Sequence, residues 1–258
     1  MSGFDPDVAA QAFLDARRTR RWLRALPEAA RPRTDADAFA IQDRVAAALG
    51  PVGGWKVGAA TSDSEPFRGP IQGDTIFDDG ARLPAGLLHV IGVEGELAYR
   101  FERDLPPWER PYATEEVLEA IGSLHPVIEI LDTRFETIGS QDALSHRADH
   151  QNSGALVVGP ALRDWRRIES LRVPIRFLLN GTVRHQDIGG NSAGDNIRLL
   201  VWMANVGTRS VGGIRSGQIV TTGSCSGTDW VEPGTEIRAE FEGVGAVGAS
   251  ILRTERME

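Results

Sequence analysis

The chain contains 258 residues, of which 28 are Lys or Arg and 36 are Asp or Glu, so its formal net charge is −8. This charge argues against non-specific binding of nucleic acid, which requires a positive surface. No run of 18 apolar residues occurs, and the first ten residues lack the basic and apolar segments of a signal peptide. We therefore expect a cytoplasmic protein with no nucleic-acid or membrane partner.

Two residue types occur only once. Cys225 is the single cysteine, which excludes an internal disulfide and a multi-cysteine metal centre, so any metal would have oxygen or imidazole ligands. Lys56 is the single lysine among the 28 basic residues. Because lysine can lose its proton in a protein and arginine cannot, Lys56 is a candidate for proton transfer. The alternative is codon bias that left one lysine by chance.

The first fifty residues have the pattern of helices. Residues 7–24 are rich in Ala, Leu and Arg, and a second helix is expected from Thr34 or Asp35, either of which can cap it, to the stop at Gly50-Pro51. Apolar residues recur at helical spacing in the second segment, namely Ala38, Ile41, Val45, Ala48 and Leu49. An amphipathic helix that packs on another part of the protein is therefore expected.

From residue 53 onward, short apolar or alternating segments broken by Gly and Pro predict strands. They span residues 55–59, 93–101, 127–131, 155–158, 173–179, 217–222 and 237–241. Helices are expected over residues 114–124 and 196–206. Since strands and helices do not alternate regularly, the sequence favours an α+β fold with a mixed, mostly antiparallel sheet that curls on itself. We expect an N-terminal helical region over residues 1–52 and one compact unit over residues 53–258.

Two carboxylates share one face of the segment 93–101. Strand alternation places Glu94 and Glu96 on the same side. Side by side they repel each other unless water screens them or a cation lies between them. A solvated outer face of the sheet is the alternative explanation.

Glu129 lies in the apolar segment PVIEIL, which is typical of a strand buried on both faces. A buried carboxylate without a partner is costly, so Glu129 needs a cation or a proton. Three glutamates without a second cysteine suit a hard divalent ion, Mg²⁺ or Mn²⁺, better than zinc. A salt bridge to Arg134 or another arginine is the alternative for Glu129.

Segments spread over most of the chain from about residue 34 carry a family resemblance. They read ADAFAIQDRV, GGWKVGA, DTIFDDG, VEGELAYRF, HPVIEILDTRF, RADHQNSGALVVG, SGQIVTTGS and PGTEIRAEFEGVGAV. The chain resembles the fumarylacetoacetate hydrolase superfamily, in particular the 2-keto-4-pentenoate (2-hydroxypenta-2,4-dienoate) hydratase branch that also contains 4-oxalocrotonate decarboxylase. The resemblance implies a mixed β-roll of that family and a homo-oligomer, with the apolar faces of the two N-terminal helices as candidate contacts.

The resemblance also implies a set of functional residues. The metal ligands of the branch match Glu94, Glu96 and Glu129. A glutamate as third ligand is typical of the hydratases, whereas the hydrolase branch usually has an aspartate. The lysine of the family's GxKxG segment corresponds to Lys56, and the acidic residue before its DG turn corresponds to Asp74. Lys56 and Asp74 are therefore the expected catalytic residues.

Substrate-binding residues are implied at two further segments. Residues 221–224 correspond to a strand end that faces the substrate, where small hydroxyl groups hold a carboxylate, which makes Thr222 and Ser224 candidates. Asp149 and His150 are the candidates from the segment RADHQNSG.

Two departures from the hydratase pattern leave the identity of the substrate open. The chain reads ADHQN over residues 148–152 where hydratases typically read ADNAS, and Asp195-Asn196 replaces a His-Pro pair. His146 and His150 have the spacing of a helical metal pair, but their polar surroundings favour loop residues, of which His150 can line the pocket.

The resemblance implies a lyase that adds water to a 2-hydroxy-2,4-dienoate and yields a 4-hydroxy-2-oxo acid in the catabolism of aromatic compounds. Lys56, helped by Asp74, would move the proton. The alternatives are a 4-oxalocrotonate-type decarboxylase, an acylpyruvate hydrolase and a non-catalytic partner subunit. Hydrolases of this superfamily use a His–Glu dyad near the N-terminus, and no histidine precedes His89. The presence of all three glutamates and Lys56 argues against an inactive subunit.

Overall fold

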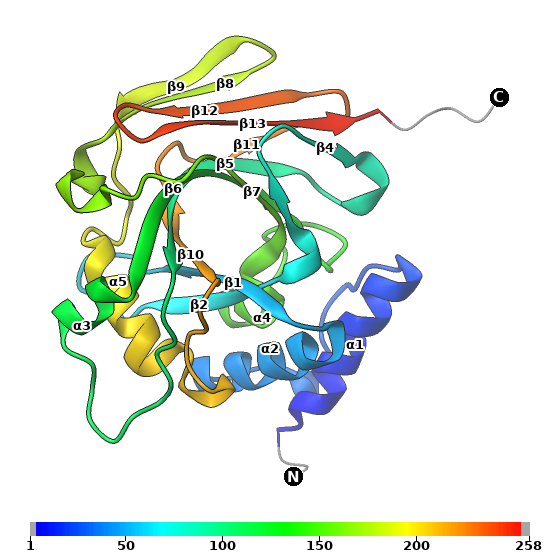
Figure 1. Ribbon diagram of the computed structural model, residues 1–258. Coiled ribbons are helices and arrows are strands. Elements are labelled where there is room, and N and C mark those ends of the chain that lie inside the picture. The colour runs from blue at the N-terminus through cyan, green and yellow to red at the C-terminus, as the bar shows by residue number, and fades with distance from the viewer. Residues whose placement is uncertain (1–3, 254–258) are drawn as a thin grey trace.

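The computed structural model describes residues 4–253 (Figure 1). Helices lie at one end of the molecule in this view, a curled sheet occupies the middle, and a flatter sheet covers the other end. The helices are α1 (Pro6–Thr19), α2 (Asp35–Leu49), α3 (Thr114–Glu119), α4 (Ala143–Ala148) and α5 (Asn196–Trp202). No helix among the described residues has the length and apolar character needed to cross a membrane.

The strands form two sheets. The larger has the order β2-β1-β10-β5-β6-β7-β3, with β11 beside β5, and the smaller has the order β4-β13-β12-β8-β9. The larger sheet contains β1 (Val52–Gly58), β2 (Phe67–Gln72), β3 (Ile76–Asp78), β5 (Gly92–Phe101), β6 (Ile121–Leu131), β7 (Ser153–Val158), β10 (Ile219–Ser224) and β11 (Asp229–Trp230). The smaller contains β4 (Ala81–Pro84), β8 (Pro174–Leu179), β9 (Thr182–Ile188), β12 (Glu236–Phe241) and β13 (Gly245–Leu252).

Most strand pairings among the described residues are antiparallel. The parallel exceptions join β1 to β10, β3 to β7 and β4 to β13. The expected α+β fold with a mixed, mostly antiparallel and curled sheet is therefore confirmed.

Strand β5 has two buried faces with different roles. Gly95 and Leu97 face the smaller sheet, and a Cβ added to Gly95 would lie 3.1 Å from Ile175 and from Phe177. The opposite face points into the curled sheet, where Ala98 joins an apolar cluster. That cluster also contains Ile71, Val127, Leu156, Val158 and Ile219. The close contact at Gly95 holds the smaller sheet against the strand that carries Glu94 and Glu96.

The two N-terminal helices begin at side-chain caps. Asp5 accepts the backbone N–H of Asp7 at 2.9 Å, and Thr34 and Asp37 form a reciprocal capping box. The apolar faces of the helices pack together and against residues from later in the chain, in a cluster of Ala9, Phe13, Ile41, Val45, Phe135 and Ala148. These faces are largely buried within one chain, whereas Leu49 at the end of α2 is exposed. The expectation that the helices form homo-oligomer contacts stays a prediction. The division of the chain at residue 52 stays a prediction.

Some expected boundaries differ from the structure. The first helix ends at Thr19, five residues early, because Arg20 adopts a left-handed conformation with φ 57° and its N–H caps the helix. The helix expected over residues 114–124 ends at Glu119, and β6 begins at Ile121. Ile121 and Leu124 are buried in β6 beside β5, so tertiary packing overrides the local helical pattern. Strand β9 was not expected because it is exposed on both faces and has no apolar alternation.

Candidate metal centre and active site

Three glutamates meet at one end of the curled sheet because of strand register. Glu94 of β5 lies directly opposite Glu129 of β6, and Glu96 follows two residues along the same face of β5. One carboxylate oxygen from each side chain lies within 4.8 Å of the other two. Glu96 and Glu129 are only 1% and 2% exposed. This face is therefore the inside of the sheet and not a solvated outer surface.

Lys56 reaches the same point from β1. Its strand is joined to β5 through β10, with Lys56 opposite Thr221. The Lys56 ammonium forms an ion pair with Glu129, and the Lys56 side chain is 11% exposed. Glu129 therefore has the single lysine as its partner, and the alternative of a salt bridge to Arg134 is not what the structure contains.

The cluster carries excess negative charge. Three carboxylates and one ammonium sum to −3 + 1 = −2 when all are ionised. Burial raises the pKa of Glu96 well above its usual value, and the neighbouring Glu129 and Glu94 raise it further. Burial also raises the pKa of Glu129, although Lys56 opposes the shift. A divalent cation would balance this charge, and three carboxylate oxygens are the ligands that a hard ion such as Mg²⁺ or Mn²⁺ prefers.

A cavity of about 270 Å³ opens onto this cluster. Its polar lining comprises Lys56, Glu94, Glu96, Glu129, Gln151, Asn152, Ser192, Thr221 and Ser224. Its apolar lining comprises Val57, Ala59, Phe67 and Leu131, and the backbone contributes Gly58 and Gly223. The Gly223 N–H donates to Glu96 Oε2 at 3.1 Å, and Thr228 donates to Glu94, which fixes two of the carboxylates.

The end of β10 presents Thr221 and Ser224 to the cavity, not Thr222. The Thr222 hydroxyl donates to the Leu97 carbonyl at 3.2 Å and is buried. Thr221 takes the cavity position because it is aligned with Lys56 on the neighbouring parallel strand. A register shift between Thr221 and Ser224 then brings Ser224 to the same side. Sequence alternation alone does not reveal this register.

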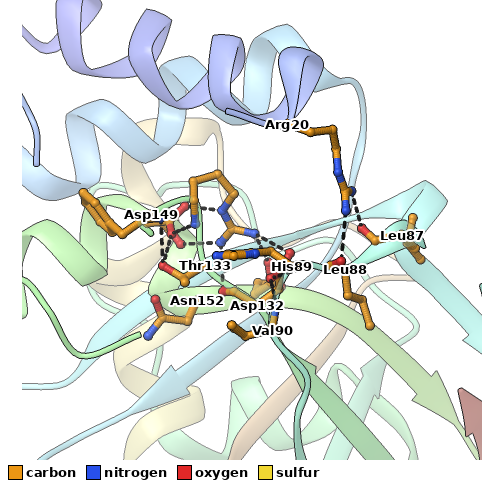
Figure 2. A network of polar contacts seen from close by, with 12 residues as sticks. Arg20, Leu87, Leu88, His89, Val90, Asp132, Thr133, Asp149 and Asn152 are labelled. Atoms are coloured by element: carbon orange, nitrogen blue, oxygen red, sulfur yellow. Dashed lines mark hydrogen bonds and ion pairs between the residues drawn. The ribbon is translucent and has the colours of Figure 1, made fainter. Parts of the chain in front are cut away.

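Asp149 is held in a buried ion pair with Arg134. Figure 2 shows Asp149 and Thr133 within a network of polar contacts. Arg134 donates from Nε to Asp149 at 2.5 Å and from its backbone N–H at 2.8 Å, and Thr133 adds a third bond at 3.1 Å. Asp149 is 1% exposed and is not among the described residues that line the cavity. Its carboxylate is therefore occupied by protein donors.

Arg134 also anchors the turn that follows Asp149. Its guanidinium donates to the carbonyls of Asp149 and Ser153, both at 3.1 Å, and so joins the two ends of residues 150–152. All three residues of this turn have left-handed backbones, with φ of 51°, 53° and 59°. Such conformations are costly for residues other than glycine and occur preferentially at functional sites.

The turn presents Gln151 and Asn152 to the cavity, whereas His150 is 2% exposed and does not line it. Gln151 and Asn152 were not expected from the sequence. The departure from the ADNAS pattern at residues 148–152 indicates that this segment differs from that of the hydratases. Which of its side chains face the cavity depends on the left-handed backbone, which the sequence does not reveal.

Asp74 lies in a short 3-10 turn, Gly73–Thr75, and is exposed. It is not one of the cavity-lining residues in the described part of the chain. Its catalytic role stays a prediction, since the ion-pair partner of Lys56 is Glu129.

His146 and Cys225 are not among the described residues that line the cavity. His146 belongs to α4 and is 8% exposed, so the expectation of a loop residue is wrong. Its ring packs edge-on against Phe135, with centroids 5.5 Å apart, which accounts for its burial. Burial raises the pKa of Cys225 to about 12, consistent with an inert thiol.

Comparisons with known proteins place this arrangement in a family. The profile of the fumarylacetoacetate (FAA) hydrolase C-terminal family matches residues 62–252. The chain belongs to this family. It is 28% identical to 2-keto-4-pentenoate hydratase 2 of Dechloromonas aromatica (strain RCB) over 187 residues, which are 72% of this chain and 70% of the relative. It is 24% identical to 4-oxalocrotonate decarboxylase of a Pseudomonas species over 197 residues, covering 72% and 71%.

A solved structure supports the same fold. The 4-oxalocrotonate decarboxylase from Pseudomonas putida G7, complexed with magnesium and adipate, has a TM-score of 0.81 to this chain at 21% identity, covering 94% of this chain and 95% of the other. The family resemblance read from the sequence is confirmed, and the relatives of this FAA hydrolase family member include hydratases and decarboxylases of one branch.

Burial of His150 in the turn at residues 150–152 should make the thermal stability of the protein depend on pH. Burial lowers the pKa of His150 well below its usual value, and Arg17, Arg134 and Arg68 nearby lower it further. In the unfolded chain the ring binds its proton near pH 6.5, so acidification below about pH 6.5 favours the unfolded state. We expect the thermal midpoint to fall less steeply from about pH 7 to 5 in His150→Gln than in the wild type.

His185→Gln, on β9, controls for the loss of one histidine. Equal slopes for His150→Gln and the wild type would contradict a neutral, buried His150.

Proposed function

We propose that the chain is a divalent-metal-dependent hydro-lyase of the 2-oxopent-4-enoate hydratase type. It adds water to a 2-hydroxy-2,4-dienoate and yields a 4-hydroxy-2-oxo acid in the catabolism of aromatic compounds. The observation that supports this most strongly is the meeting of Glu94, Glu96, Glu129 and Lys56 at one cavity. Membership of an enzyme family with hydratase relatives supports the same reaction.

Glu94, Glu96 and Glu129 would hold the cation, Mg²⁺ or Mn²⁺. The charge of −2 that the cluster carries when all four groups are ionised, together with its oxygen ligands, supports a divalent ion. The related decarboxylase structure complexed with magnesium supports it further. When bound, the ion would supply positive charge that stabilises the negative charge developing on the C2 oxygen of the substrate.

The residues of the chain carry the remaining chemistry. Lys56 Nζ moves the proton that converts the dienol to its keto form, because it is the only cation among the described residues that line the cavity. Thr221 and Ser224 line the wall beside Lys56. The Ser224 hydroxyl donates to the Gly227 carbonyl at 3.1 Å, and the Thr221 hydroxyl is buried. A role for Ser224 in binding the substrate carboxylate stays a prediction. Val57, Phe67 and Leu131 cover the apolar part of the dienoate and keep bulk water away.

The cavity favours a substrate with one carboxylate. A decarboxylase substrate such as a 2-oxo-hexenedioate carries a second carboxylate, for which a guanidinium is the usual partner. No arginine lines the cavity in the described residues. This lining supports hydration over decarboxylation, which is the second candidate because decarboxylases are among the relatives. A cytoplasmic location, a homo-oligomeric state and roles for Asp74, Thr222, Asp149 and His150 stay predictions.

Metal binding predicts a thermal shift that depends on the carboxylates. Saturating Mg²⁺ or Mn²⁺ should raise the melting temperature of the wild type by about 5 °C or more, because the ion binds only the folded state. Glu94→Gln, Glu96→Gln and Glu129→Gln should each lose most of this shift. Glu96→Gln should not lower the melting temperature of the metal-free protein, since it removes a buried negative charge.

Asp229→Asn, an acidic residue on β11 outside the cluster, is the control and should keep the shift. A wild-type shift in Glu129→Gln would remove Glu129 from the metal site.

The reaction is tested by a screen of 2-hydroxy-2,4-dienoates and 2-oxo-hexenedioates with added Mg²⁺ or Mn²⁺. We expect hydration of a monocarboxylate, and release of CO₂ without hydration would favour the decarboxylase instead. On the best substrate, Lys56→Arg should lower kcat by about 10²-fold or more, because arginine keeps the charge but cannot lose its proton.

The metal-induced thermal shift of Lys56→Arg should stay close to that of the wild type. Near-normal turnover in Lys56→Arg would make Lys56 structural. In that case Asp74→Asn tests the other expected catalytic residue.

A further inference from the structure

Asn152 presents a carboxamide to the cavity, and the hydrogen bonds of His146 determine how that carboxamide is oriented. We infer that His146 is a positioning residue that makes Asn152 a hydrogen-bond donor toward the cavity, and that this donor binds the water that adds to the substrate. The inference rests on the proposed hydratase function for the identity of that ligand. The orientation of Asn152 rests on the structure alone.

The protonation state of the His146 ring follows from its partners. Nε2 lies 3.3 Å from the backbone nitrogen of Gln141, which can only donate, so Nε2 must accept. A neutral imidazole that accepts at Nε2 carries its proton on Nδ1. Nδ1 lies 3.0 Å from Asn152 Oδ1. The Nδ1–H group therefore donates to the side-chain oxygen of Asn152.

This bond leaves only one orientation for the Asn152 amide. If the amide were reversed, its NH₂ group would face the Nδ1–H of His146, donor against donor. With the oxygen on His146, the Nδ2 group has no acceptor within hydrogen-bond distance among residues 4–253. Asn152 is half-buried and lines the cavity, so its NH₂ group is the part available to a bound molecule.

The backbone of Asn152 is fixed as firmly as its side chain. Its N–H donates to the Asp149 carbonyl at 2.9 Å, and its carbonyl accepts from the Asp132 N–H at 2.9 Å. Figure 2 shows the Asn152 side chain extending away from Asp132 and the network around Asp149. The left-handed backbone and the Arg134 anchor described above thus hold the donor in one place, so little order has to be gained when a ligand binds.

Gln151 lines the same cavity beside this donor. Its Oε1 atom is shielded from solvent and has no protein partner among the described residues, so it does not face a molecule bound in the cavity. The Asn152 NH₂ group is not shielded in this way. On this wall of the cavity, the Asn152 NH₂ group is therefore the donor that can bind the oxygen of the water.

If Asn152 binds the water, its loss should slow the hydration step but not the tautomerisation step. Tautomerisation of the dienol depends on Lys56, whereas hydration also depends on Asn152. His146→Leu and Asn152→Ala should lower hydration by about 10-fold or more, the scale of one hydrogen bond to a reacting group, while consumption of the dienol changes little. The keto tautomer should then accumulate, as followed by ultraviolet absorbance and by chromatography of the products.

Matched variants keep this test specific. His146→Asn retains a donor near the place of Nδ1 and should recover hydration, and His185→Leu, on β9 outside the cavity, should behave as the wild type. The metal-induced thermal shift should be unchanged in every variant. If both steps fall together, or if His146→Asn is as impaired as His146→Leu, the positioning role is overturned.

A second measurement is independent of activity. Nitrogen-15 NMR of the His146 ring in the wild type should show the Nδ1–H tautomer, and a proton on Nε2 would overturn the proposal even if no dienoate is turned over. Failure of the wild type to hydrate any dienoate in the screen, with the Nδ1–H tautomer present, would instead reject the proposed function.

Discussion

Repulsion between buried carboxylates is the constraint on which the rest of this structure depends. Glu96 and Glu129 are almost completely buried, Glu94 lies beside them, and Lys56 compensates only one of the three charges. Removing such groups from water is costly, and a fold retains them when a ligand or reaction offsets the cost. Burial raises the pKa of Glu96 and of Glu129, as expected for carboxylates that have been removed from water.

The architecture brings these charges together through both of its sheets. Curling of the larger sheet brings β1 close to β6, so that Lys56 reaches Glu129 across two intervening strands. The smaller sheet packs on the outer face of β5, where Gly95 allows close approach directly between the two glutamates in sequence. The Arg134–Asp149 ion pair then fixes the turn that closes one wall of the cavity. Apolar packing between the two sheets and buried ion pairs thus act together to position the polar side chains of the site.

The sequence predicts the charged part of this site better than its neutral part. The sequence marks Glu94, Glu96 and Glu129 because a carboxylate in an apolar strand is costly to bury without a cation or a proton. It marks Lys56 because this is the only lysine. Thr221, Gln151 and Asn152 carry no such signal, since small polar residues are common in turns and strand ends. Their placement depends on the pairing of β1 with β10 and on three left-handed residues, which are consequences of tertiary structure. The same limit explains why residues 121–124 form a strand in spite of a helical pattern.

The proposed site for one divalent ion lies between Glu94, Glu96 and Glu129. Anomalous diffraction from crystals containing Mn²⁺ tests it most directly, because the signal locates the ion without assumptions about its ligands. We expect a single strong peak at the cavity floor, about 2.0–2.3 Å from an oxygen of each of the three carboxylates. A strong peak elsewhere, or none at this position with Mn²⁺ in excess, would contradict it.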